Sequence, residues 1–115
     1  MMCKMKNSIL HLFFLPALLI VQPIVENAIK HGLMKLQKGG HIRVISYETD
    51  KDYCISVEDD GVGFDTSKLF YDKKHIGIRN IRDRLKVMVG GKLEIESRVG
   101  VGTKVLIIIP KEAKK

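Results

Sequence analysis

Two Gly-Gly pairs, at positions 39–40 and 90–91, each separate a segment of helical periodicity from a segment of strand periodicity. Before the first pair, from Pro16 to about Leu36, apolar residues recur every three or four positions, and this spacing returns from Gly77 to Val89. After each pair, two short runs alternate around turn residues. The order helix, hairpin, helix, hairpin predicts an α+β fold, a two-layer sandwich with helices on one face of a mostly antiparallel mixed sheet.

The pattern also predicts which side chains face the core. The expected strands are His41–Glu48, Tyr53–Glu58, Lys92–Ser97 and Thr103–Ile109. At about 100° per residue, the first helix divides into an apolar half and a polar half. The apolar half holds Val21, Ile24, Val25, Ala28, Ile29 and Leu33, and the polar half holds Gln22, Pro23, Glu26, Asn27, Lys30 and His31. In the second helix the apolar repeat is Ile78, Ile81, Leu85 and Met88.

Composition limits the classes of function. The 115 residues are enough for one domain, and their net charge of +7 comes from scattered basic residues. Only 6% of the residues are aromatic, which argues against a nucleic-acid interface. The charge suits an anionic ligand such as a nucleotide, and an ordinary solvated surface explains it equally well. Cys3 and Cys54 lack the spacing of a disulfide framework or a zinc site.

The N-terminal residues superficially resemble a signal peptide, because Lys4 and Lys6 precede an apolar run from Ile9 to Val21. That run is too short to span a membrane comfortably, and no small-residue cleavage site follows it. We therefore interpret residues 1–14 as a truncated lead-in, residues 15–110 as the folded domain and residues 111–115 as a basic tail, with a signal peptide as the alternative.

Three glycine-bearing segments lie at ends of the expected elements, at residues 59–63, 75–78 and 100–103. Each alone is more typical of a turn than of a ligand site, and none matches a P-loop or a Rossmann fingerprint. Asp59, directly before the first, is able to accept a hydrogen bond from the exocyclic amine of an adenine, although a lone Asp-x-Gly more often caps a turn.

The polar half of the first helix offers groups that suit a metal nucleotide. The carboxylate of Glu26 and the amide of Asn27 carry oxygens of the kind that Mg²⁺ prefers. Lys30 and His31 are able to meet phosphate oxygens. A solvated helix face is the alternative, and it explains the polarity but not this grouping around an amide.

Together these segments resemble the ATP-binding domain of sensor histidine kinases. Residues 22–32 read Q-P-I-V-E-N-A-I-K-H-G, which is similar to the N box of one subgroup of that family. Residues 57–64 resemble its D-x-G-x-G box, residues 75–85 its G-[IL]-G-L-x-N segment, and residues 100–103 its final G-x-G-T box. The motifs occur in the family's order, over about residues 15–110.

The resemblance implies a Bergerat ATP-binding sandwich with ATP and Mg²⁺ as cofactors. Asp59 would bind the adenine amino group. Gly61 and Gly63 would let the base lie against the loop, and Thr103, after Gly102, would support Asp59 through water. Glu26 and Asn27 are the candidate catalytic residues, with Asn27 as the Mg²⁺ ligand and Lys30 and His31 near the phosphates. Residues 65–76, which contain Lys73 and Lys74, would form a lid that ends at Gly77.

The resemblance also implies partners and a place in the cell. The γ-phosphoryl group would pass to a histidine on a separate dimerisation domain, and from there to a response regulator. The family's phosphoacceptor signature does not occur in this sequence, and His11 lacks its context. We therefore expect no autophosphorylation by this chain alone, a cytoplasmic location compatible with a membrane-anchored parent protein, and no contact with nucleic acid or membrane.

Two alternatives stay open within the same fold. A stand-alone ATPase of the gyrase and heat-shock chaperone type would carry a glutamate four residues before the metal-binding asparagine. Pro23 holds that position here and cannot act as a base, while Glu26 points about 100° away from Asn27. The other alternative is an anti-sigma-like serine kinase or nucleotide-binding module, and the run from Glu26 to Gly32 favours the histidine kinase subgroup over it.

Overall fold

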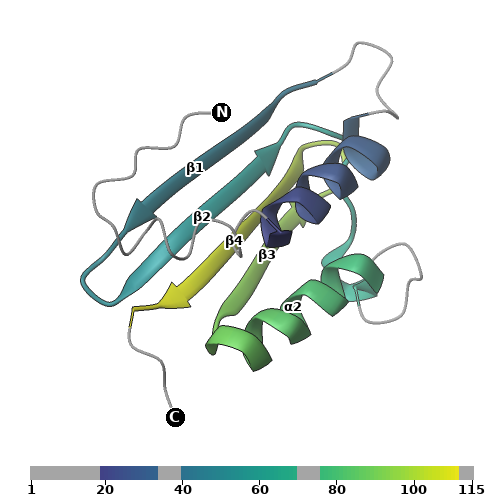
Figure 1. The fold of residues 1–115 in the computed structure, drawn as a ribbon. Helices are drawn as coiled ribbons and strands as arrows, with labels where there is room; N and C mark the ends of the chain where they lie inside the picture. Colours follow the sequence, from purple (N-terminus) through teal and green to yellow (C-terminus); the bar gives the residue numbers. More distant parts are fainter. Residues whose placement is uncertain (1–18, 34–39, 70–75, 112–115) are drawn as a thin grey trace.

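Four strands form one antiparallel sheet, and helices cover one of its faces (Figure 1). The computed structural model describes residues 19–33, 40–69 and 76–111. The strands are β1 (Ile42–Glu48), β2 (Asp52–Asp59), β3 (Lys92–Arg98) and β4 (Gly102–Pro110). Their order across the sheet is β1-β2-β4-β3, so β1 and β3 are the outer strands among the described residues. The predicted α+β sandwich is confirmed, and the pairing of the described strands is antiparallel throughout.

The helices agree with the predicted segments, with one local difference. Residues 19–27 are α-helical, and the helix continues without a break as a π-helix, η1 (Ala28–Leu33). The second helix, α2 (Ile76–Val89), ends where the Gly-Gly pair at 90–91 begins. A short 3₁₀ helix, η2 (Thr66–Lys68), follows Asp65, whose side chain accepts a hydrogen bond from the Ser67 N–H. Lys73 and Lys74 lie outside the described residues.

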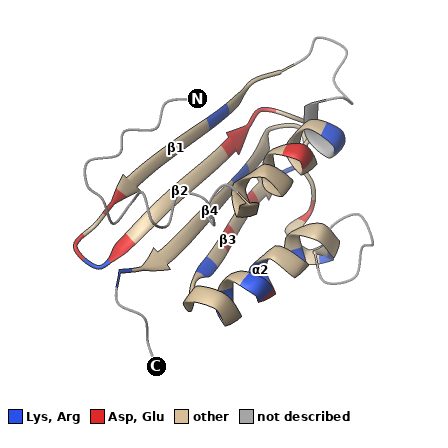
Figure 2. Ribbon diagram, viewed as in Figure 1, with Lys and Arg blue, Asp and Glu red and all other residues tan. Residues whose placement is uncertain are grey.

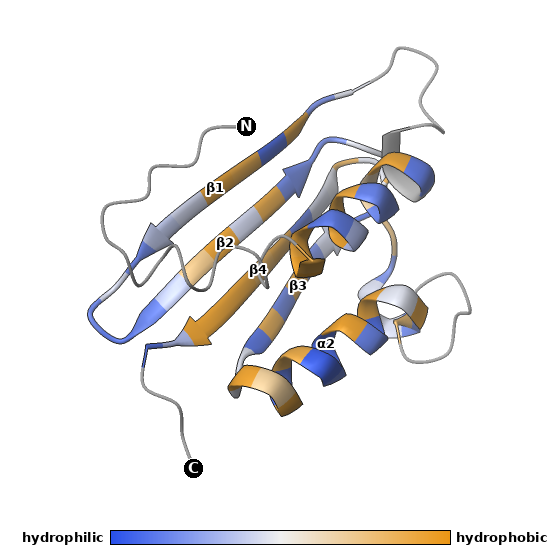
Figure 3. Cartoon of the chain, viewed as in Figure 1, coloured by the Kyte–Doolittle hydropathy of each residue, from blue (hydrophilic) through white to orange (hydrophobic). Residues whose placement is uncertain are grey.

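The core fills the space between the helices and the sheet. Hydrophobic and hydrophilic residues alternate along the helices in Figure 3, and β4 is mostly hydrophobic. Val57, Leu85 and Ile107 are its most enclosed members, each no more than 1% exposed. On the first hairpin, Ile42, Val44, Tyr53, Ile55 and Val57 all pack in the core. The register pairs Val57 with Val105 and Ile55 with Ile107, so matching apolar residues lie side by side.

Two predicted core residues are exposed. Ile29 is 41% exposed, because it follows the start of η1 and a π turn advances by a smaller angle per residue than the α-helical wheel assumes. Met88 is 65% exposed, and Val89 packs against the core instead. Four residues after Leu85, Val89 lies closer to the direction of Leu85 around the helix than Met88 does.

Acidic and basic residues are interspersed along the strands and helices (Figure 2).

Cys54 is a buried free thiol on β2. Among the described residues, no helix is both long and apolar enough to cross a membrane.

Candidate functional site

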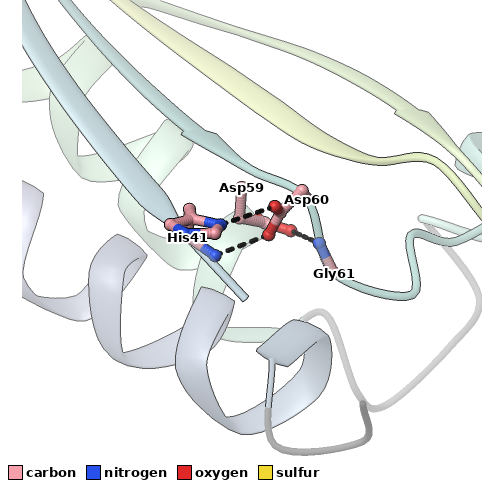
Figure 4. Close-up of polar contacts among 4 residues, drawn as sticks. All are labelled: His41, Asp59, Asp60 and Gly61. Atoms are coloured by element: carbon pink, nitrogen blue, oxygen red, sulfur yellow. Dashed lines mark hydrogen bonds and ion pairs between the residues drawn. The ribbon is translucent and has the colours of Figure 1, made fainter. Parts of the chain in front are cut away.

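The turn after β2 presents a half-buried carboxylate. Asp59 is the last residue of β2, and its Oδ1 accepts a hydrogen bond from the Gly61 N–H at 2.9 Å (Figure 4). This contact folds the side chain over its own turn, as the Asp-x-Gly sequence predicts. The backbone of Thr103 also hydrogen-bonds to this carboxylate. A carboxylate has acceptor sites for a further N–H donor besides these.

The electrostatics of Asp59 favour such a donor. Burial raises the pKa of the Asp59 carboxyl above its ordinary value, although hydrogen bonds from the backbone of Gly61 and Thr103 act in the opposite direction. The neighbouring Asp60 carboxylate raises it further. A partly desolvated carboxylate gains more from an incoming N–H group than a fully hydrated one does, because its own water contacts are already reduced.

Two glycines let the surrounding loops pack without side chains. Gly102 has φ 138°, and a Cβ there would lie 2.1 Å from the backbone oxygen of Asp59. Gly63 has φ 67°, and its Cβ would lie 2.1 Å from the backbone oxygen of Arg98. The Gly100 N–H also donates to the Val62 carbonyl at 2.8 Å. The first and third glycine segments of the sequence are therefore in direct contact.

Ser97 on β3 joins these loops, and the sequence motifs do not include it. Its Oγ accepts from the Phe64 N–H at 2.8 Å and donates to the Gly102 carbonyl at 3.0 Å. The Thr103 hydroxyl lies 2.8 Å from the same oxygen. The available signal was a polar residue at an inward-facing position of β3, in register with Thr103. Thr103 is thus tied to Ser97 by its hydroxyl and to Asp59 by its backbone.

A cavity of about 590 Å³ opens beside these residues. It is an open hollow on the surface rather than an enclosed pocket. Residues from β2, β3, β4 and their loops line it: Glu58, Asp59, Thr66, Ile95, Glu96, Ser97, Arg98, Val101, Gly102, Thr103 and Lys104. Of the predicted adenine-side residues, Asp59, Gly102 and Thr103 line this hollow, and Gly61 and Gly63 do not.

The helix that carries the other predicted site residues packs close to this region. Its last part, η1, contacts both β2 and β4. Asn27, directly before η1, is half-buried, whereas Glu26 and Lys30 are exposed, and the Gln22 side chain donates to Glu26 at 3.3 Å. None of Asn27, Glu26 and Lys30 lines the cavity. The His31 side chain lies outside the described residues.

Gly77, the predicted end of the lid, lies in the first turn of α2. It is exposed, and a Cβ there would meet no atom within 4 Å. Close packing therefore does not explain a glycine at this position, in contrast to Gly63 and Gly102.

The comparisons with known proteins agree on one family. The sequence model described as "Histidine kinase-, DNA gyrase B-, and HSP90-like ATPase" matches residues 15–113. The uncharacterized protein YwpD of Bacillus subtilis is 38% identical over 117 residues, which cover 89% of this chain and 41% of YwpD. An uncharacterized sensor-like histidine kinase of Chloroflexus aurantiacus is 37% identical over 98 residues, covering 82% of this chain and 15% of the relative.

A solved structure shares the fold. The histidine kinase domain of a blue-light activated histidine kinase from Erythrobacter litoralis superimposes with a TM-score of 0.67 at 27% identity. The match covers 80% of this chain and 42% of that one. This chain therefore spans less than half the length of each of these proteins.

Proposed function

This chain belongs to the family of histidine kinase-, DNA gyrase B- and HSP90-like ATPases, and from this premise we propose that it is the ATP-binding catalytic domain of a sensor histidine kinase. In this role it holds Mg·ATP so that the γ-phosphoryl group faces a histidine on a separate dimerisation domain. A response regulator then receives the phosphoryl group from that histidine.

One observation carries the proposal: a partly desolvated carboxylate, Asp59, lies on a cavity of about 590 Å³ between two glycine loops. The adenine amino group is the donor that suits Asp59. Gly61, Gly63 and Gly102 keep the turn compact enough for a flat base to approach. Thr103 supports Asp59, and its link to Ser97 fixes its position.

The remaining proposed roles belong to the first helix and the start of α2. Asn27 would hold Mg²⁺ through its amide oxygen, and the ion would help to neutralise the charge of the phosphates. Lys30 and His31 approach the phosphates, and Glu26 is the second candidate catalytic residue, next to Asn27. Gly77 ends the lid. Phosphoryl transfer in such a site depends on positioning and on neutralising charge, and both are tasks for these groups. We place the domain in the cytoplasm.

A thermal-shift titration with ATP tests the proposal. ATP with Mg²⁺ should raise the melting temperature of the wild-type chain, because a ligand that binds only the folded state stabilises it. Asp59→Asn should weaken binding by about tenfold or more, since it removes a charge-assisted hydrogen bond.

Asp50→Asn is the matched control. It makes the same chemical change at an exposed position in the β1–β2 turn, away from the end of β2 that carries Asp59. It should leave the titration unchanged. A wild-type chain that shows no shift, or an Asp59→Asn variant that binds as the wild type does, would remove the basis of the proposal.

A further inference from the structure

The side chain next to Asp59 attaches the turn to a different strand. Asp60 Oδ1 accepts a hydrogen bond from the backbone N–H of His41 at 2.6 Å (Figure 4). Its Oδ2 lies 3.1 Å from His41 Nδ1, and the Asp60 N–H donates to the His41 carbonyl at 3.3 Å. Residues 41 and 60 are thus joined by both backbone and side chain.

These contacts continue the sheet by one step. The last pair in the β1–β2 register is Ile42 with Asp59, and the bonds between His41 and Asp60 come directly after it. On the other side of Asp59, its partner is Thr103 of β4, and Gly102 packs against its backbone oxygen. Asp59 is therefore held from both neighbouring strands, through Asp60 on the β1 side and through β4 on the other.

We propose that Asp60 is a positioning residue of the nucleotide site, which uses the His41 backbone N–H to fix the turn so that the Asp59 carboxylate faces the base. This inference rests on the proposed ATP-binding function. Asp60 itself need not touch the nucleotide, since its carboxylate is occupied by His41. Its role is to hold the backbone between Asp59 and Gly61.

The backbone N–H, rather than the imidazole, is the important partner. The His41 side chain is 92% exposed and that of Asp60 54%, so solvent screens any charge attraction between them. The His41 backbone N–H is also the largest cause of the lowered pKa of the Asp60 carboxyl. Removing the imidazole should therefore matter much less than removing either end of the bond to the backbone.

Four variants separate these contributions. Asp60→Ala removes the acceptor, and His41→Pro removes the donor N–H at a position just before a strand, where proline is tolerated. Asp60→Asn keeps an acceptor oxygen, and His41→Ala keeps the N–H. Calorimetric titration of the whole chain with ATP and with ADP should show binding weakened roughly three- to tenfold in the first two and within about twofold of wild type in the others.

Two further readouts identify a positioning effect. The loss should be the same factor for ATP and ADP, because the change acts at the base and not at the γ-phosphate. The amide resonance of Gly61, which reports its bond to Asp59, should shift in Asp60→Ala and His41→Pro but stay close to wild type in Asp60→Asn. Melting temperatures should change little, because the contact is at the surface.

The outcomes are distinguishable. If the wild-type chain binds neither nucleotide, the proposed function and this inference both fall. If it binds and Asp60→Ala and His41→Pro bind equally well, only the inference is wrong. If His41→Ala weakens binding as much as His41→Pro does, the imidazole and not the backbone N–H is the anchor, and the proposed mechanism is overturned.

Discussion

At the scale of single residues, two opposing effects act on the pKa of Asp59: burial raises it, and hydrogen bonds from the backbone of Gly61 and Thr103 lower it. Burial raises its pKa above the ordinary 3.8, so the ionised form is less favourable in the folded chain than in the unfolded one. For a carboxyl with a raised folded pKa, the stabilising contribution is complete below the unfolded value and is lost as pH rises through the folded value. At neutral pH the unliganded site therefore carries a cost that a bound donor would relieve.

This cost predicts a pH dependence. Without nucleotide, Asp59→Asn should melt no lower than the wild type at pH 7, and its advantage should shrink as the pH falls through the raised pKa of Asp59, because the wild-type carboxyl then becomes neutral. Melting curves of both proteins across that range give the measurement. A variant that melts well below the wild type at pH 7 would show that the hydrogen bonds from Gly61 and Thr103 outweigh burial.

Two serines of the sheet, Ser97 and Ser56, differ in their hydrogen bonding. Ser97 bonds to Phe64, Gly102 and Thr103, whereas the buried Ser56 hydroxyl has no hydrogen-bond partner among the described residues. Ser97→Ala should lower the free energy of unfolding by about 1–3 kcal/mol, because it leaves partly buried backbone groups unsatisfied. Ser56→Ala should be neutral or stabilising. Urea unfolding compares them, and equal losses would contradict the assigned network.

At the scale of elements, the close contact between β2 and β4 depends on one glycine. Gly102→Ala would place a methyl group against the Asp59 carbonyl and force a residue with a side chain into φ 138°. We expect a loss of at least about 2 kcal/mol in unfolding free energy, together with weaker nucleotide binding.

Gly77→Ala is the matched substitution for that test. In α2 it meets nothing within 4 Å, so it should be neutral or stabilise by up to about 1 kcal/mol. Chemical denaturation monitored by circular dichroism measures both variants. If Gly102→Ala were as stable as Gly77→Ala, β2 and β4 would not be packed as closely at Asp59 and Gly102 as described.

The helices and strands could be predicted because their hydrophobic patterns are local in the sequence. Alternation around the β1–β2 turn located that hairpin to within about a residue, and the Asp-x-Gly pattern predicted the turn contact between Asp59 and Gly61. The errors at Ile29 and Met88 arose because a helical wheel assumes a uniform turn and does not reveal where a helix widens or leaves the core. Ser97 and His41 were missed for a different reason. Their contacts join residues far apart in the chain, which only the folded register brings together.

At the scale of the whole molecule, the proposed binding roles are divided between the sheet and the first helix. The ends of β2 and β4 form the proposed base-recognition side, and the first helix supplies the groups proposed for the metal and phosphates. η1 joins the two by packing on both strands. Because the proposal uses both layers to hold the nucleotide, a phosphoryl acceptor would approach from outside them.

This arrangement predicts that the isolated chain binds ATP without labelling itself. Of its four histidines, His31 lies in the helix that is proposed to hold the phosphates, and His41 is attached to Asp60. Transfer requires the acceptor nitrogen close to the γ-phosphorus and in line with the leaving oxygen. Incubation with γ-labelled Mg·ATP should therefore leave no base-stable, acid-labile phosphate on the chain, under conditions where a thermal shift confirms binding. Label on a histidine of this chain, removed by replacing that histidine, would mean that the domain carries its own acceptor.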